Sequence, residues 1–160
     1  MNIISAPSDL VIANSDGIDV RFAGINLDRA PGYVGERAGE QSVHLHLNGI
    51  RGTETQLRDS QFLRDLQDWS ERDKDLEVVG QEQYPPQMPS IAVFDQIGIE
   101  LTDDVGTEYR RVGGKMAGSG TEWDVLWIYT PAPPPNARTL QIGFDVDGQT
   151  TGKHCILSLD

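Results

Sequence analysis

Apolar side chains recur at every second position over much of this chain, and this period of two constrains the fold more than any other feature. The clearest examples are the runs at residues 43–47 and 140–146. Successive side chains of a β-strand point to opposite faces, so such alternation is typical of strands with one buried face. Asp, Gly and Pro separate the runs and provide turns. The sequence therefore predicts an all-β protein, an antiparallel two-sheet sandwich of about eight short strands.

The runs and the turn residues between them give the expected elements. Strands are expected at residues 10–12, 18–22 with a continuation toward 27, 42–48, 97–102, 107–112, 123–129, 139–146 and from 155 toward the end of the chain. Turns at 14–17 and 103–106 combine Asp or Asn with Gly, which predicts two hairpins, one near the start and one over 97–112. Polar or glycine-rich stretches at 28–41 and 113–120 are expected to be loops.

One segment departs from the period of two. Phe62, Leu66 and Trp69 have the spacing i, i+4, i+7, and acids and arginines fill many positions around them. This spacing predicts an amphipathic helix at about 55–72, inserted between strands and covering an edge or an open end of the sheets. A long irregular excursion is the alternative. Residues 73–90, rich in charge and proline, are expected to form an extended connection.

Length and charge narrow the class of protein. A chain of 160 residues fits one domain over 1–160, with a helical insertion. The net charge of -12 argues against broad binding to nucleic acid or to an anionic membrane. The sequence shows neither a secretory signal nor an apolar run of roughly 20 residues, so a cytoplasmic protein is expected. No nucleophile elbow, phosphate loop or dinucleotide fingerprint occurs in it, so no cofactor is expected.

The last third of the chain resembles a known group of domains. Leu101–Tyr109 with its Asp-Asp-x-Gly-x-x-Tyr pattern, the proline-rich segment Trp127–Pro135, and Ala137–Leu140 follow one another around a glycine-rich loop. This layout resembles immunoglobulin-like domains of uncharacterised bacterial proteins. The resemblance covers about the last third of the chain and implies an immunoglobulin-like β-sandwich, but it carries no catalytic residues. The paired cysteines of antibody-type domains are missing, because Cys155 is the only cysteine.

Three histidines form a candidate metal site. His44 and His46 are two residues apart on an expected strand, so both rings point to the same side, and His154 on the last strand could be a third ligand. The alternative is that Val43, Leu45 and Leu47 face the core, which leaves both histidines on the solvent face without a ligand role.

Acidic turns form a second candidate site. Asp16, Asp103, Asp104, Asp145 and Asp147 lie at expected strand ends, where carboxylates from neighbouring loops could gather around calcium. Neither acidic turn completes an EF-hand pattern. Since aspartate beside glycine is a common turn former, the alternative is that these side chains only shape the turns.

The remaining hypothesis is a non-catalytic binding or assembly module. Trp123, Trp127 and Tyr129 share one face of an expected strand whose other face is also apolar. Such a strand is either central and covered on both sides, or it presents an aromatic surface to a protein partner or a second copy. Cys155 lies among apolar residues and is expected to be an inert core thiol.

Overall fold

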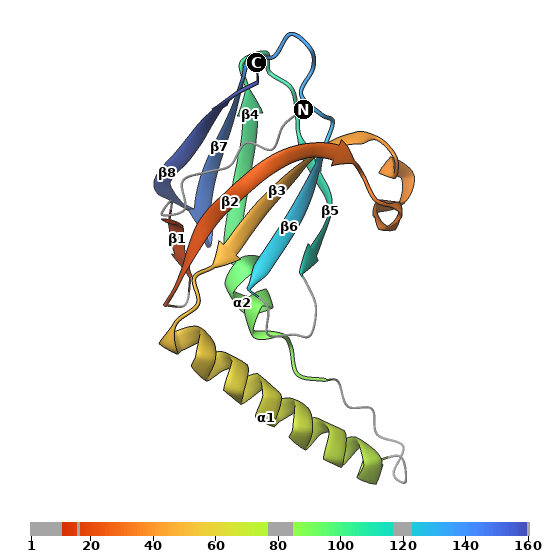
Figure 1. The fold of residues 1–160 in the computed structure, drawn as a ribbon, viewed down its shortest axis with the longest axis vertical. Helices are drawn as coiled ribbons and strands as arrows, with labels where there is room; N and C mark the ends of the chain where they lie inside the picture. Colours follow the sequence, from red (N-terminus) through yellow and green to blue (C-terminus); the bar gives the residue numbers. More distant parts are fainter. Residues whose placement is uncertain (1–10, 16, 77–84, 117–122, 160) are drawn as a thin grey trace.

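The computed structural model describes residues 11–15, 17–76, 85–116 and 123–159. They form two antiparallel sheets whose facing sides build a common core (Figure 1). The larger sheet has the order β1-β2-β3-β6-β5, with β1 (Val11–Ser15), β2 (Ile18–Arg29), β3 (Gln41–Gly49), β6 (Asp124–Thr130) and β5 (Arg110–Met116). The smaller sheet has the order β4-β7-β8, with β4 (Ile97–Asp103), β7 (Thr139–Val146) and β8 (Gln149–Ser158). The prediction of two antiparallel sheets is confirmed.

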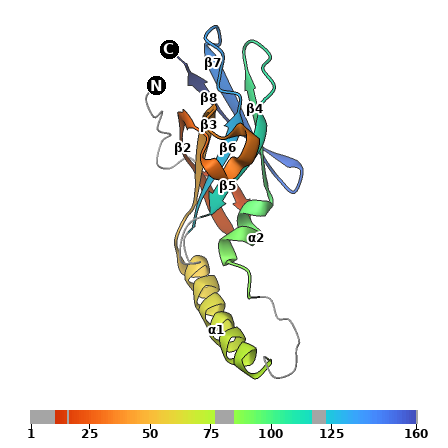
Figure 2. The same cartoon turned by 90° about the vertical axis from the view of Figure 1, so that its right-hand side faces the viewer.

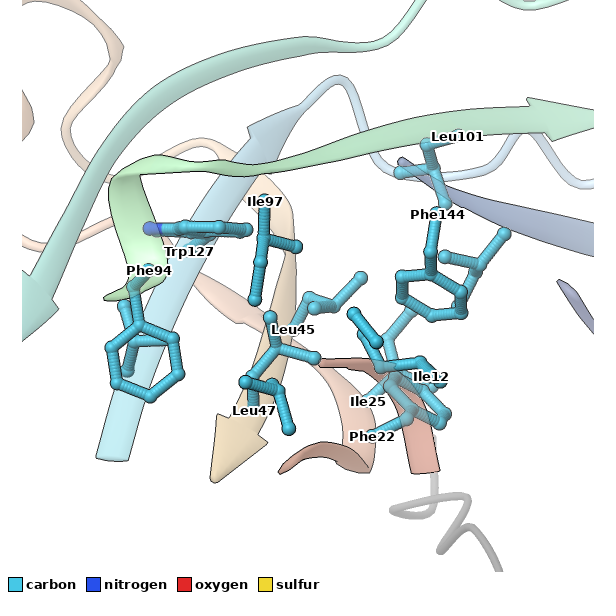
Figure 3. Close-up of a cluster of buried hydrophobic side chains, with 14 of the residues drawn as sticks. Ile12, Phe22, Ile25, Leu45, Leu47, Phe94, Ile97, Leu101, Trp127 and Phe144 are labelled. Atoms are coloured by element: carbon cyan, nitrogen blue, oxygen red, sulfur yellow. The ribbon is translucent and has the colours of Figure 1, made fainter. Parts of the chain in front are cut away.

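The alternating apolar residues supply the core. Val43, Leu45 and Leu47 of β3 have no exposed surface, and they face residues of the smaller sheet such as Ile142. The rings of Phe22 and Phe144 meet across the two sheets with their centroids 6.1 Å apart (Figure 3). Burial of these side chains is the main favourable term that holds the sheets together.

Helices occupy the connection between β3 and β4. The expected helix is present as α1 (Thr53–Leu76), and α2 (Pro89–Asp95) forms inside the stretch that was expected to be extended. Residues 77–84 of that stretch lie outside the described residues. Figures 1 and 2 show α1 projecting away from the sheets, whereas α2 closes their end and buries Val93 and Phe94. The expectation that the long helix covers an open end is therefore wrong, because the short helix does so.

The hairpin expected over 97–112 is also wrong. β4 pairs with β7 in the smaller sheet, and β5 pairs with β6 in the larger one, so the chain crosses between sheets after Asp103. β5 also runs on to Met116 through Gly113 and Gly114, which were expected to lie in a loop. Residues 117–122 lie outside the described part of the chain.

The other turns agree with expectation. β1 and β2 form the first hairpin, in which Ser15 pairs with Ile18, and Asp147 and Gly148 both have positive φ between β7 and β8. The expected loop over 28–41 holds the end of β2 and a short 3-10 helix, η1 (Gly32–Arg37), which lies over the outer face of the larger sheet beside β5 (Figure 2). No helix within the described ranges is long and apolar enough to cross a membrane.

Candidate functional site

The three histidines do not come together. His44 and His46 lie on the outer face of β3 in the larger sheet, whereas His154 is exposed on β8 in the smaller sheet. Among the described residues, no group of three His, Cys, Asp or Glu side chains is placed to hold a metal ion. The prediction of a histidine metal site is therefore wrong, because its third ligand belongs to a different sheet.

His44 and His46 have structural partners instead. The Ser42 hydroxyl donates to the backbone oxygen of Asp28 at 2.8 Å, so the His44 Nε2–H, 2.9 Å away, must donate to the same hydroxyl oxygen. This arrangement gives His44 no role as a base toward Ser42. His46 Nε2 lies 2.8 Å from Oδ1 of Asn26, and burial, followed by the nearby His44, lowers the pKa of His46. Both rings lie on the side of β3 opposite the core, but His44 is only 8 % exposed, so the expected solvent-facing position is wrong for it, and His46 is half-buried.

The acidic turns lie at opposite ends of the smaller sheet. Asp103 pairs with Leu140, whereas Asp145 pairs with Gly98. Asp145 thus lies beside a position five residues before Asp103 on β4, which at ~3.4 Å per residue is about 17 Å away along the strand. Asp104 accepts hydrogen bonds from the backbone N–H groups of Arg138 and Thr139. The predicted calcium cluster of Asp103, Asp104, Asp145 and Asp147 is therefore wrong. Asp16 lies outside the described residues.

The aromatic residues in and directly before β6 belong to the core. Trp123, Trp127 and Tyr129 are 1, 5 and 6 % exposed, and Ile128 on the opposite face is fully buried. β6 is thus the covered central strand, lying between β3 and β5, and these side chains form no exposed aromatic surface, although Tyr129 reaches a pocket described below. Cys155 is half-buried, and burial raises the pKa of its thiol, which disfavours the reactive thiolate.

A different group of residues forms a pocket where the two sheets diverge. The pocket lies between the edge strands β4 and β5 and has a volume of about 360 Å³. We call it the β4–β5 pocket, and its lining residues are Asp95, Ile97, Gly98, Ile99, Tyr109, Arg111 and Tyr129. Pockets of this size are sufficient for small ligands.

Arg111 is the cationic group of the pocket. Its guanidinium carbon lies 4.9 Å from the centre of the Trp127 ring, a cation–π arrangement that holds the side chain at the pocket wall. Within the described part of the chain, no carboxylate forms an ion pair with Arg111. A guanidinium fixed by stacking but not neutralised is well suited to bind a carboxylate through two parallel hydrogen bonds.

Two tyrosines line the pocket with Arg111, one with its hydroxyl hydrogen-bonded and one with its hydroxyl unbonded within the described residues. The Tyr109 hydroxyl donates to Oδ2 of Asp103 at 2.7 Å, and burial together with this bond raises the pKa of Tyr109. Burial raises the pKa of Tyr129 to about 12, partly offset by the Arg111 charge, so Tyr129 stays a neutral donor. Its hydroxyl has no hydrogen-bond partner among the described residues and can donate to a ligand.

Of the polar residues in this pocket, the sequence points only to Tyr129, as part of the predicted aromatic surface, and gives no role to Asp95, Tyr109 or Arg111. The sequence pattern places Tyr109 and Arg111 in a hairpin strand and Asp95 outside every expected element. One feature of the sequence points toward this region: Arg111 is followed two residues later by the pair Gly113–Gly114. Glycines in a strand leave room for large side chains on the neighbouring strand. That signal indicates close packing and does not by itself indicate a ligand.

The fold and this site define an antiparallel two-sheet protein with a polar pocket between two strand edges. Comparison with models of protein families, with curated proteins and with solved structures found no significant match to the chain.

Proposed function

We propose that this protein is a non-catalytic binding module that recognises a carboxylate-bearing ligand in the β4–β5 pocket. The observation that carries this proposal is the Arg111 guanidinium, held against Trp127 and not neutralised by a described carboxylate. The unpartnered Tyr129 hydroxyl in the same pocket supplies a second donor. A carboxylate would pair with the guanidinium and accept the phenolic hydrogen, and such charge-assisted bonds are stronger than neutral ones.

The fold that carries this pocket is proposed to be immunoglobulin-like. In constant-type immunoglobulin domains, four strands in the order A-B-E-D face three in the order C-F-G. The strands β2-β3-β6-β5 facing β4-β7-β8 support the same order, with β1 as an added edge strand. In that correspondence the helices α1 and α2 replace the loop between strands B and C, one of the loops that form binding surfaces in variable domains.

Titration with N-acetyl-valine tests the proposed function, because this probe carries one carboxylate and one small apolar side chain. We expect saturable, millimolar binding in two-dimensional NMR, with shifts confined to signals of the pocket residues. The Arg111→Gln variant should lose this binding at least tenfold. The matched control is Arg110→Gln, because Arg110 is the next residue of β5 and does not line this pocket.

N-acetyl-valine amide, which lacks the negative charge, should bind neither the wild-type protein nor the Arg111→Gln variant. The proposed site would be ruled out if N-acetyl-valine did not bind the wild-type protein. It would also be ruled out if N-acetyl-valine bound Arg111→Gln as tightly as wild type. Thermal unfolding of both variants checks that the loss is not a loss of fold.

A further inference from the structure

The strand that borders the β4–β5 pocket has an unusually regular edge. Among the described strands, four lie at sheet edges: β1, β4, β5 and β8. Three of them, β1, β5 and β8, pair with their neighbours through a register shift. β4 pairs with β7 over seven consecutive residues without such a shift. Bulges, lysine and proline are the common devices that protect an edge from an added strand, and β4 has none of them.

The open part of this edge lies beside the pocket. β4 pairs only with β7, so every second residue directs its N–H and C=O away from the smaller sheet. At the far end of β4, the chain that crosses to the larger sheet is bonded to Asp103 by Thr107 and Tyr109. The near end, Ile97–Ile99, lines the pocket together with Arg111, and Gly98, which has no side chain, does so through its backbone.

From this juxtaposition we propose that the β4–β5 pocket binds the carboxyl-terminal end of an extended basic peptide, which adds as a short strand along β4. The inference rests on the proposed carboxylate site and names its ligand. The terminal carboxylate pairs with Arg111 and Tyr129, and the backbone of the preceding residues bonds to the edge of β4. Strand addition gains affinity from main-chain bonds, while pockets for alternate side chains give selectivity.

The charge of the protein selects the rest of the peptide. The chain has a net charge of -12, and Asp95 lies at the pocket without an ion-pair partner among the described residues. A peptide whose inner residues are basic is therefore attracted, whereas an acidic peptide is repelled. Ile97 and Ile99 favour a small apolar side chain at the terminal residue.

The test is fluorescence polarisation with a fluorescein-labelled pentapeptide, Gly-Lys-Val-Lys-Val, prepared as the free acid and as the terminal amide. We expect the acid to bind the full chain at least tenfold more tightly than both the amide and N-acetyl-valine. Two further peptides carry methyl groups on the backbone nitrogens of alternate residues, one on the odd and one on the even positions. Because only one of these sets faces β4, one of the two peptides should bind at least tenfold more weakly. Replacement of both lysines by glutamate should weaken binding by a similar factor, with less effect at high salt.

Variants separate the two levels of the proposal. Tyr129→Phe removes only the hydroxyl and should lower the affinity for the free-acid pentapeptide a few-fold. Arg111→Lys keeps the charge but not the planar guanidinium, so its affinity should lie between those of wild type and Arg111→Gln. If N-acetyl-valine binds through Arg111 but the pentapeptide gains nothing over it, or both methylated peptides bind normally, strand addition is refuted and the carboxylate site stands. If neither probe binds, both proposals are refuted.

Discussion

Two consecutive glycines in β5 show how single residues set the packing of this protein. A Cβ at Gly113 would lie 2.7 Å from Cγ1 of Val34 in η1. A Cβ at Gly114 would lie 2.8 Å from both the Leu126 carbonyl oxygen and Cδ1 of Trp127. The missing side chain at Gly114 therefore provides the space for the indole on which Arg111 stacks.

We predict that Gly114→Ala lowers the free energy of unfolding by about 2 kcal/mol, because neither the backbone oxygen nor the buried ring can move away cheaply. Gly143→Ala is the matched control, since Gly143 is also in a strand and its nearest neighbour to an added Cβ is 3.9 Å away. The control should change the free energy by no more than about 0.5 kcal/mol. Urea unfolding measures both, and equal effects of the two substitutions would contradict the packing explanation.

At the scale of elements, α1 is joined to the sheets near its first turns. The indole N–H of Trp123 donates to Oδ1 of Asp59 at 3.0 Å, and Phe62 is 7 % exposed, whereas Leu57 and Leu63 are more than half exposed. The Asp59 contact fixes where the helix leaves the end of the larger sheet, because Trp123 lies directly before β6 and is buried.

We predict that Asp59→Ala lowers the free energy of unfolding by roughly 1 to 2 kcal/mol, because the indole N–H loses a charged acceptor at a buried position. Asp68→Ala is the control, because Asp68 is exposed on the same helix, and its effect should stay within about 0.5 kcal/mol. Urea unfolding followed by tryptophan fluorescence measures both. A loss of stability in the control equal to that in Asp59→Ala would show that the helix, and not this bond, is responsible.

The alternation in the sequence predicts most of the strands but not which sheet each one joins. The apolar period of residues 97–102 is the same whether the strand pairs with the next one or with β7, so local pattern favoured the nearest partner. Only packing across the core distinguishes the two, and it places β4 and β5 in different sheets. The helix α2 was missed because seven residues are too few for a helical period to stand out.

At the scale of the whole molecule, Asp103 stabilises the passage of the chain from one sheet to the other. Its carboxylate accepts the backbone N–H groups of Val105 and Thr107 and the hydroxyl of Tyr109. Desolvation raises the pKa of Asp103, but the hydrogen bonds from Thr107, Tyr109 and Val105 together lower it well below its usual 3.8. The folded state thus favours the charged form, which stabilises the protein above pH 3.8 and loses this effect as the pH falls further.

We predict that Asp103→Asn lowers the free energy of unfolding at neutral pH by about 1 kcal/mol, a value limited by solvent exposure of the carboxylate. The difference from wild type should shrink as the pH falls below 3.8, since the carboxyl of the unfolded wild-type chain is then protonated and must lose its proton on folding. Glu100→Gln, on the exposed side of the same strand, should leave the stability nearly unchanged. A pH-independent difference between Asp103→Asn and wild type would contradict a charge-assisted role for these bonds.

The candidate site was less predictable than the fold because it depends on how the sheets stack. The side of β3 that carries His44 and His46 follows from alternation, but the distance of His154 from them follows only from the sheet order. Asp95, Arg111 and Tyr129 come from three elements and meet at an opening between sheets. No spacing in the sequence encodes that opening.

The position of the insertion between β3 and β4 has an evolutionary consequence. Gly49 ends β3 at the same end of the molecule at which Ile97 begins β4, next to the β1–β2 and β7–β8 turns (Figure 1). Because closing a longer loop costs little additional entropy, residues between them can be gained or lost without changing the pairing of any strand. Descendants and ancestors of this chain can therefore differ greatly in length while keeping the scaffold formed by the eight strands of the described residues.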